Sequence, residues 1–76
     1  MPPLIPPKAG FIATLTRIRR AGEIRWMDAD RKRLYTWDAL HGELEVYNAH
    51  GYHLGSVDPV TGRTLKSAVR GRRINV

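Results

Sequence analysis

The segment from residue 37 to residue 47 carries the side chains of this sequence that are best suited to acid–base chemistry. In chain order, its ionisable groups other than tyrosine are Asp38, His41, Glu43 and Glu45. A carboxylate can accept a proton and a nearby imidazole can supply one, so this set could provide a general base and a general acid. The same pattern also fits an exposed alternating strand beside a capping histidine, which is common in small β proteins.

The spacing within this segment predicts how a strand would place these groups. Residues two apart in a strand share a face and lie roughly 6.6 Å apart. Glu43, Glu45 and Tyr47 would therefore project together, while Leu44 and Val46 pack on the opposite side. The glycine before this strand lets the preceding histidine turn toward the polar face, with an aspartate close behind it to orient the ring.

Cleavage of RNA through the ribose 2′-hydroxyl requires groups of this kind. A base removes the 2′-OH proton, the oxygen attacks the adjacent phosphorus, an acid protonates the departing 5′-oxygen, and a fixed cation stabilises the charge on phosphorus. Neither a metal ion nor a covalent enzyme intermediate is needed. The residues are therefore compatible with a metal-independent ribonuclease.

The charges are divided along the chain. The formal net charge is +6, which points to a polyanionic partner, either a nucleic acid or an acidic protein. Residues 1–33 carry eight basic and three acidic side chains, residues 34–62 carry four carboxylates and no Lys or Arg, and residues 63–76 carry five basic side chains and no acid. Basic flanks would hold a polyanion and the acidic centre would act on it. Alternatively, the centre is an acidic strand pair neutralised by its basic neighbours.

Several classes of protein are disfavoured by the composition. The chain has no cysteine, so it has no disulfide framework, thiolate zinc site or cysteine nucleophile. No apolar run approaches the ~20 residues of a membrane span, and the proline-rich start does not resemble a signal peptide. Ser56 follows His53 without a nucleophile elbow. The histidines at positions 41, 50 and 53 form only a weak candidate for a metal site.

The 76 residues are enough for one domain, and their patterning predicts a mainly β fold, α+β at most. Four prolines in residues 1–9 indicate an extended arm, and residues 11–18 fit a strand or a short helix. Strands are expected at 23–27, 34–37, 43–47, 52–57 and 64–69, with a short one at 74–76. Turns are expected at 21–22, 28–33, 48–51 and 58–62. We expect a small antiparallel sheet with Trp26 and Trp37 in its core and at most one or two tyrosines at the substrate.

Two blocks carry a family resemblance: WDxxHGELExY at residues 37–47 and HLGSxDPxTG at residues 53–62. Arg25-Trp26, Leu65-Lys66 and Arg72-x-Ile74 flank them in matching order and spacing. Residues 25–75 thus resemble the cytotoxic ribonuclease domain of the E-group colicins that cut small-subunit ribosomal RNA, whereas residues 1–20 do not match. The resemblance implies a highly twisted antiparallel sheet that enters the ribosomal decoding site and cleaves one bond of 16S-type RNA, which halts translation.

The resemblance also implies roles for particular residues. The family's catalytic positions fall on Asp38 as orienter, His41 as acid, Glu45 as base and Arg72 as phosphate stabiliser. Glu43 and Tyr47 are expected to support them, with no cofactor and no metal. The basic residues expected to bind RNA are Arg31, Lys32, Arg33, Lys66, Arg70 and Arg73.

The expected partners are the ribosome with its small-subunit RNA and a small acidic immunity or antitoxin protein, but no membrane. The protein would act in the bacterial cytoplasm, either as an intracellular toxin or as part of a larger secreted toxin. Three alternatives stay open from the sequence. One is a non-catalytic RNA- or ribosome-binding module, another is a toxin that acts on tRNA or mRNA, and the third is a metal-dependent DNase, for which the histidine-rich metal motif is missing.

Overall fold

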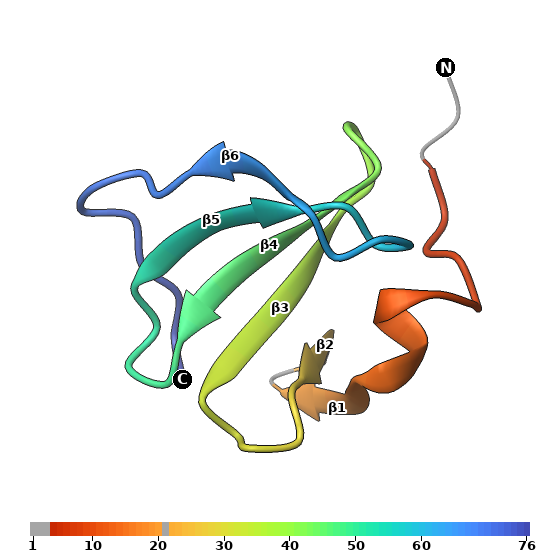
Figure 1. Ribbon diagram of the computed structural model, residues 1–76. Coiled ribbons are helices and arrows are strands. Elements are labelled where there is room, and N and C mark those ends of the chain that lie inside the picture. Colours follow the sequence, from red (N-terminus) through yellow and green to blue (C-terminus); the bar gives the residue numbers. More distant parts are fainter. Residues whose placement is uncertain (1–3, 21) are drawn as a thin grey trace.

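Six antiparallel strands lie in the sheet in the same order as in the chain (Figure 1). The computed structural model describes residues 4–20 and 22–76. Its elements are the 3₁₀ helix η1 (Phe11–Thr14) and the strands β1 (Thr16–Arg20), β2 (Glu23–Met27), β3 (Arg33–Asp38), β4 (Glu43–Asn48), β5 (His53–Val57) and β6 (Thr64–Ser67). The strands change direction steadily from β6 to β1 (Figure 1), so the sheet is strongly twisted. The predicted mainly β, antiparallel fold is confirmed.

The ends of the chain differ in detail from the prediction. Residues 11–18 divide into η1 and the start of β1, and Ala21 of the expected turn lies outside the described residues. The prediction of a last strand at 74–76 is wrong. The chain there makes only an isolated bridge between Arg73 and Tyr52, because its backbone pairs with the chain near the β4–β5 turn and then crosses the sheet face rather than running along an edge strand.

One face of the sheet forms the hydrophobic core. Directly paired residues of antiparallel strands share a face, and the register pairs Trp26 with Tyr35, Tyr35 with Val46, and Trp37 with Leu44. The buried cluster consists of Ile12, Trp26, Tyr35, Leu44 and Val46. Ile12 belongs to η1, which covers this face and is tied to the β5–β6 turn by backbone bonds from Phe11 to Val60 and from Ile12 to Pro59. The predicted core position is confirmed for Trp26, whereas Trp37 is only partly buried against the cluster.

The opposite face carries the polar residues of β4. The register pairs Asp38 with Glu43 and Leu34 with Tyr47, so Glu43, Glu45 and Tyr47 do project together as the spacing predicted. The irregular segment 68–76 crosses this face and leaves Tyr47 with 1% of its surface exposed.

This covering segment is held by contacts with two distant parts of the chain. The backbone N–H of Ile74 donates to Gly51 O at 2.9 Å, and the N–H of His53 donates to Arg72 O at 3.0 Å. Gly51 has φ +89°, and a Cβ atom there would lie 2.3 Å from Ile74 O, so the close approach requires glycine. Arg25, from β2, donates a hydrogen bond to the carbonyl of Asn75. The polar face is thereby partly enclosed.

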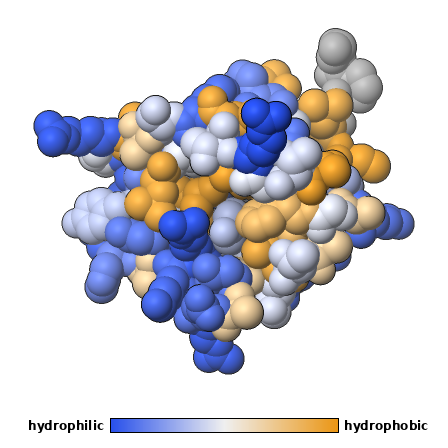
Figure 2. Space-filling view, viewed as in Figure 1, coloured by the Kyte–Doolittle hydropathy of each residue, from blue (hydrophilic) through white to orange (hydrophobic). Residues whose placement is uncertain are grey.

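The surface is also divided. Figure 2 shows mainly hydrophobic residues over the arm and η1, and mainly hydrophilic residues on the side of the β6-to-C-terminal loop and the β2–β3 turn. Among the described residues, no helix has the length and apolar character needed to cross a membrane.

Candidate active site

An aspartate and a histidine form a pair in the turn between β3 and β4. His41 Nδ1 lies 2.8 Å from Asp38 Oδ2. Asp38 Oδ1 accepts the backbone N–H groups of Leu40 and His41, both at 3.0 Å. Burial opposes ionisation of Asp38, but the hydrogen bonds from the His41 ring and from these backbone groups outweigh it and lower the pKa of Asp38. An ionised Asp38 therefore orients the His41 ring, whose side chain stays 52% exposed and available to a substrate.

A glutamate, a histidine and an arginine form a second group on the same face. Glu45 Oε2 lies 2.9 Å from His53 Nε2, and Glu45 Oε1 lies 3.3 Å from Arg72 Nη1. The side chain of Glu45 is 11% exposed, that of His53 is 2% exposed and that of Arg72 is 44% exposed. Glu45 is thus nearly enclosed, with its cation at the surface. The irregular segment 68–76, which carries Arg72, covers Glu45.

A lysine and a third carboxylate lie between these two groups. Lys66 Nζ is 3.0 Å from Glu43 Oε1. The hydrogen bond to Glu43 raises the pKa of Lys66; desolvation opposes this, while the negative charges of Glu43, Asp38 and Glu45 add to it. The positive charge of Lys66 is therefore stabilised by all three carboxylates of the site, those of Glu43, Asp38 and Glu45. It also shows that basic residues near the C-terminus neutralise part of the acidic centre, as one interpretation of the charge pattern suggested.

The same region contains one arrangement that could hold a metal ion. Potential ligand atoms of Asp38, His41 and Glu43 lie within 4.8 Å of one another. His41 Nδ1 and Glu43 Oε1 already have protein partners in Asp38 and Lys66, so a metal would have to displace them. The three histidines considered as ligands lie apart, because His41 is in the β3–β4 turn, His50 in the β4–β5 turn and His53 in β5.

The buried ring of Tyr47 packs against His53 and Arg72 of the second group. Its ring meets the ring of His53 edge-on, with centroids 5.3 Å apart, and the Arg72 guanidinium lies 5.9 Å from its centroid. Because Tyr47 is buried, it cannot stack on a base. Tyr52 is half exposed, but the Arg73 guanidinium covers its ring at 5.0 Å.

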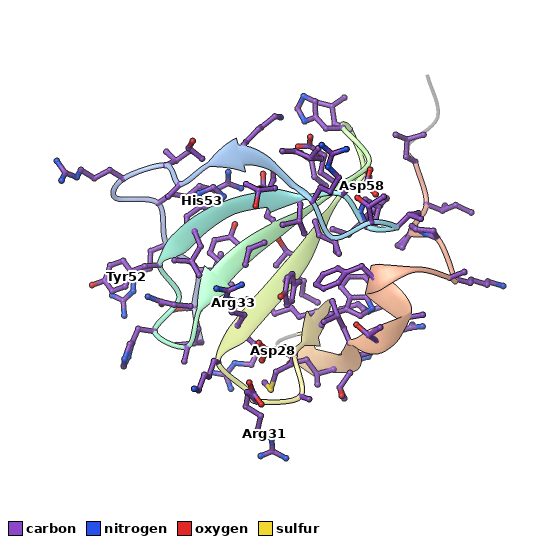
Figure 3. All side chains as sticks on the ribbon, in the orientation of Figure 1. Asp28, Arg31, Arg33, Tyr52, His53 and Asp58 are labelled. Carbon is purple, nitrogen blue, oxygen red and sulfur yellow. The ribbon has the colours of Figure 1, made fainter. Side chains whose placement is uncertain are left out.

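The basic residues expected to bind RNA are spread over the surface. Arg31 and Lys32 lie in the β2–β3 turn and Arg33 begins β3, at the opposite end of that strand from Asp38. Figure 3 shows Arg31 and Tyr52 pointing away from the sheet and His53 lying over β5. Lys66 lies at the site, and exposed Arg70 and Arg73 belong to the segment that covers it. The structure thus places Lys66 and Arg72 beside the carboxylates. The basic residues of the β2–β3 turn lie away from them.

His53 is a candidate site residue that reasoning from single residues missed, since it was considered only as a metal ligand and as a neighbour of Ser56. Its ring spans the site, with Nε2 at Glu45 and Nδ1 accepting the backbone N–H of Val69 at 2.9 Å. The available signal was its place at the start of the HLGSxDPxTG block. Pairing in the sheet sets it opposite Tyr47, which brings it next to Glu45.

Fold and site together define a small basic β domain in which carboxylates, imidazoles and cations share one sheet face, a set suited to acid–base chemistry on an anionic substrate. A family model described as Cytotoxic matches residues 7–75, and the chain belongs to this family. The predicted resemblance is confirmed. The family model matches from residue 7 onward, whereas the motifs that carried the resemblance begin at residue 25.

Three proteins of Escherichia coli are similar to this chain over 51 residues, or 66% of its length. They are colicin E3 at 49% identity, colicin E6 at 47% and cloacin at 45%. The chain covers 9% of the length of each of these relatives.

Proposed function

We propose that the protein is a ribosome-targeting endoribonuclease toxin that cleaves small-subunit RNA at the decoding site and so blocks translation. The observation that carries this proposal is the juxtaposition of an exposed Asp38–His41 pair with an enclosed Glu45 that contacts a cation. Membership of the Cytotoxic family and similarity to the rRNA-cleaving E-group colicins support the choice of substrate.

In the proposed mechanism, Glu45 removes the proton from a ribose 2′-hydroxyl and the resulting oxygen attacks the adjacent phosphorus. His41, oriented by Asp38, protonates the 5′-oxygen as its bond to phosphorus breaks. The products are a 2′,3′-cyclic phosphate and a free 5′-hydroxyl. Arg72 exchanges its contact with Glu45 for one with the phosphate, which frees the base and stabilises the charge that develops on phosphorus.

The test is to incubate the protein with purified bacterial ribosomes in EDTA and to separate the RNA on a gel. We expect a short new fragment from the 3′ end of the small-subunit RNA that begins with a 5′-hydroxyl, and a long upstream fragment that ends in a cyclic phosphate; neither should form with His41→Ala. Loss of cleavage in EDTA that returns with a divalent ion would assign the Asp38, His41 and Glu43 cluster to a metal. Inhibition of translation without a fragment would indicate a non-catalytic ribosome-binding module, and cleavage of tRNA or mRNA alone would change the substrate.

The basic surface also supports a protein partner. The net charge of +6 complements a small acidic immunity or antitoxin protein that would protect the producing cell. The site of action in this proposal is the cytoplasm of a bacterial cell, reached either from within or as part of a larger secreted toxin.

A further inference from the structure

The N-terminal arm, residues 4–10, contacts the turn that carries Asp38 and His41. The backbone N–H of Leu4 donates to Ala39 O at 2.9 Å. The carbonyl of Leu4 accepts the indole Nε1–H of Trp37, also at 2.9 Å. Trp37 and Ala39 are the two chain neighbours of Asp38, so one arm residue is bonded on both sides of this aspartate.

Leu4 also packs against the far end of the same turn. Gly42 has φ +69°, and a Cβ atom at that position would lie 2.8 Å from Leu4 Cδ1. The leucine side chain therefore rests on the bare backbone of this glycine. Contacts of Leu4 thus reach the start, the middle and the end of the segment 37–42.

Burial contributes little to holding this turn. Leu40 is 81% exposed and Leu4 is 51% exposed, and His41 is exposed as well. The turn is organised around Asp38, whose carboxylate accepts the N–H groups of Leu40 and His41 while its carbonyl accepts the N–H of Gly42 at 2.8 Å. A hydrogen bond from outside has a large effect on such a segment, because few packing contacts compete with it.

We propose that Leu4 is a positioning residue, which holds segment 37–42 so that Asp38 keeps the His41 ring oriented toward the substrate. The inference rests on the proposed function for its effect on cleavage, but the contact between arm and turn can be measured without any substrate. The arm that the sequence motifs left unmatched is thereby assigned to the site.

Two substitutions remove the two bonds separately. Trp37→Phe keeps an aromatic ring in place and removes the donor to Leu4 O, and Leu4→Pro removes the donor to Ala39 O. The matched control is Ile5→Pro, at a neighbouring arm residue that is 83% exposed. Leu4→Met, which keeps the backbone bonds and a long apolar side chain, tests rescue by a conservative change.

The first measurement is amide hydrogen exchange. We expect exchange of the Leu40, His41 and Gly42 amides to accelerate about fivefold in Trp37→Phe and in Leu4→Pro, the usual net effect of one hydrogen bond. Amides in β4, such as those of Val46 and Tyr47, should keep their wild-type rates. Ile5→Pro and Leu4→Met should leave the turn unchanged.

The second measurement is ribosome cleavage. A displaced His41 lowers kcat about fivefold to tenfold while KM stays within about twofold. Unchanged exchange in the turn of both variants would overturn the inference, and so would an equal acceleration by Ile5→Pro. If Trp37→Phe does not fold, the exchange rates of the turn amides in Leu4→Pro decide whether the inference holds. If the wild type cleaves no RNA, the proposed function fails, while the exchange data still decide whether the arm holds the turn.

Discussion

His53 donates its Nε2 hydrogen to Glu45, and the opposite side of its ring determines this direction. The backbone N–H of Val69 can only donate, so His53 Nδ1, 2.9 Å away, must be the acceptor. The hydrogen of a neutral ring then resides on Nε2, which lies 2.9 Å from Glu45 Oε2. Glu45 Oε2 is therefore held as a hydrogen-bond acceptor by a buried ring that is itself anchored to the chain after β6.

This relationship predicts a loss of both activity and stability in His53→Ala. The substitution leaves Glu45 Oε2 without its donor and opens a cavity beside Tyr47. We expect cleavage to fall at least tenfold and the free energy of unfolding to fall by about 2 kcal/mol, measured by ribosome cleavage and urea unfolding. His50→Ala, in the exposed β4–β5 turn, is the control and should resemble the wild type. Full activity of His53→Ala would exclude His53 from the site.

His41→Ala and Glu45→Gln should differ in stability while both lose activity. Each removes a proposed proton-transfer group, so we expect cleavage to fall by about a hundredfold or more. The half-exposed ring of His41 adds little to folding, whereas Glu45→Gln weakens the enclosed contacts with His53 and Arg72. The Tm of Glu45→Gln should fall clearly below that of His41→Ala. Glu43→Gln should cost less activity than either, and near-wild-type cleavage by either main variant would remove that residue from the mechanism.

A lysine at position 72 should not replace the arginine in cleavage. A guanidinium presents two parallel donors to a phosphate, whereas an ammonium is a point charge on a flexible stem. We expect cleavage by Arg72→Lys to be reduced about as much as by Arg72→Ala, measured on ribosomes at equal protein concentration. Arg73→Ala is the neighbouring control, because Arg73 lies over Tyr52 rather than at Glu45. An active Arg72→Lys with an inactive Arg73→Ala would assign the catalytic cation to Arg73.

The lowered pKa of Asp38 predicts acid sensitivity of the fold. A carboxyl whose pKa is lower in the folded than in the unfolded chain stabilises the fold above its unfolded value. This contribution is lost as the pH falls through the folded pKa, which lies below the ordinary value of 3.8. Unfolding by urea between pH 7 and pH 2 should therefore show a loss of stability that begins near pH 4.

Three variants distinguish the source of this loss. Asp38→Asn should make the decline shallower and should also impair cleavage at pH 7. Asp58 gives a comparison, because its pKa is lowered chiefly by the backbone N–H groups of Thr61 and Val60. Asp58→Asn should make the loss of stability at low pH shallower without affecting cleavage. Asp30→Asn, at an exposed turn position, should leave the decline as it is. A decline that is identical in Asp38→Asn and wild type would contradict the assignment.

The proposed acidic partner predicts salt-dependent association. Exposed charges are screened beyond about 8 Å at physiological ionic strength, and complementary charges mainly accelerate association. For a tight one-to-one complex with a small acidic protein encoded by an adjacent gene, the association rate should fall steeply as salt rises, as measured by stopped-flow fluorescence. A rate that does not depend on salt would show that the basic surface does not steer this partner.

The parts of the site that were predictable are those that depend on local spacing. Asp38 and His41 are three residues apart in one turn, and Glu43 and Glu45 alternate in one strand, so periodicity was sufficient to place them. The place of Arg72 beside Glu45 spans 27 residues and was suggested only by the family resemblance. Burial of Glu45 and Tyr47 was not predictable, because the irregular segment that covers them has no periodic pattern to reveal its path. The same holds for Leu4, whose two hydrogen bonds to the turn use backbone groups that nearly every residue carries.

The strictly sequential order of the strands has a consequence for how the protein reaches its folded state. Every strand pairs only with its neighbours in the chain, so the contact order of the sheet is low for an all-β domain and folding should be comparatively rapid. The contacts of Arg25 with Asn75 and of Glu45 with Arg72 are different, because each closes a long loop. We expect the sheet to assemble first and the C-terminal segment to dock last, so that Arg72, the proposed catalytic cation, reaches Glu45 only in the final step of folding.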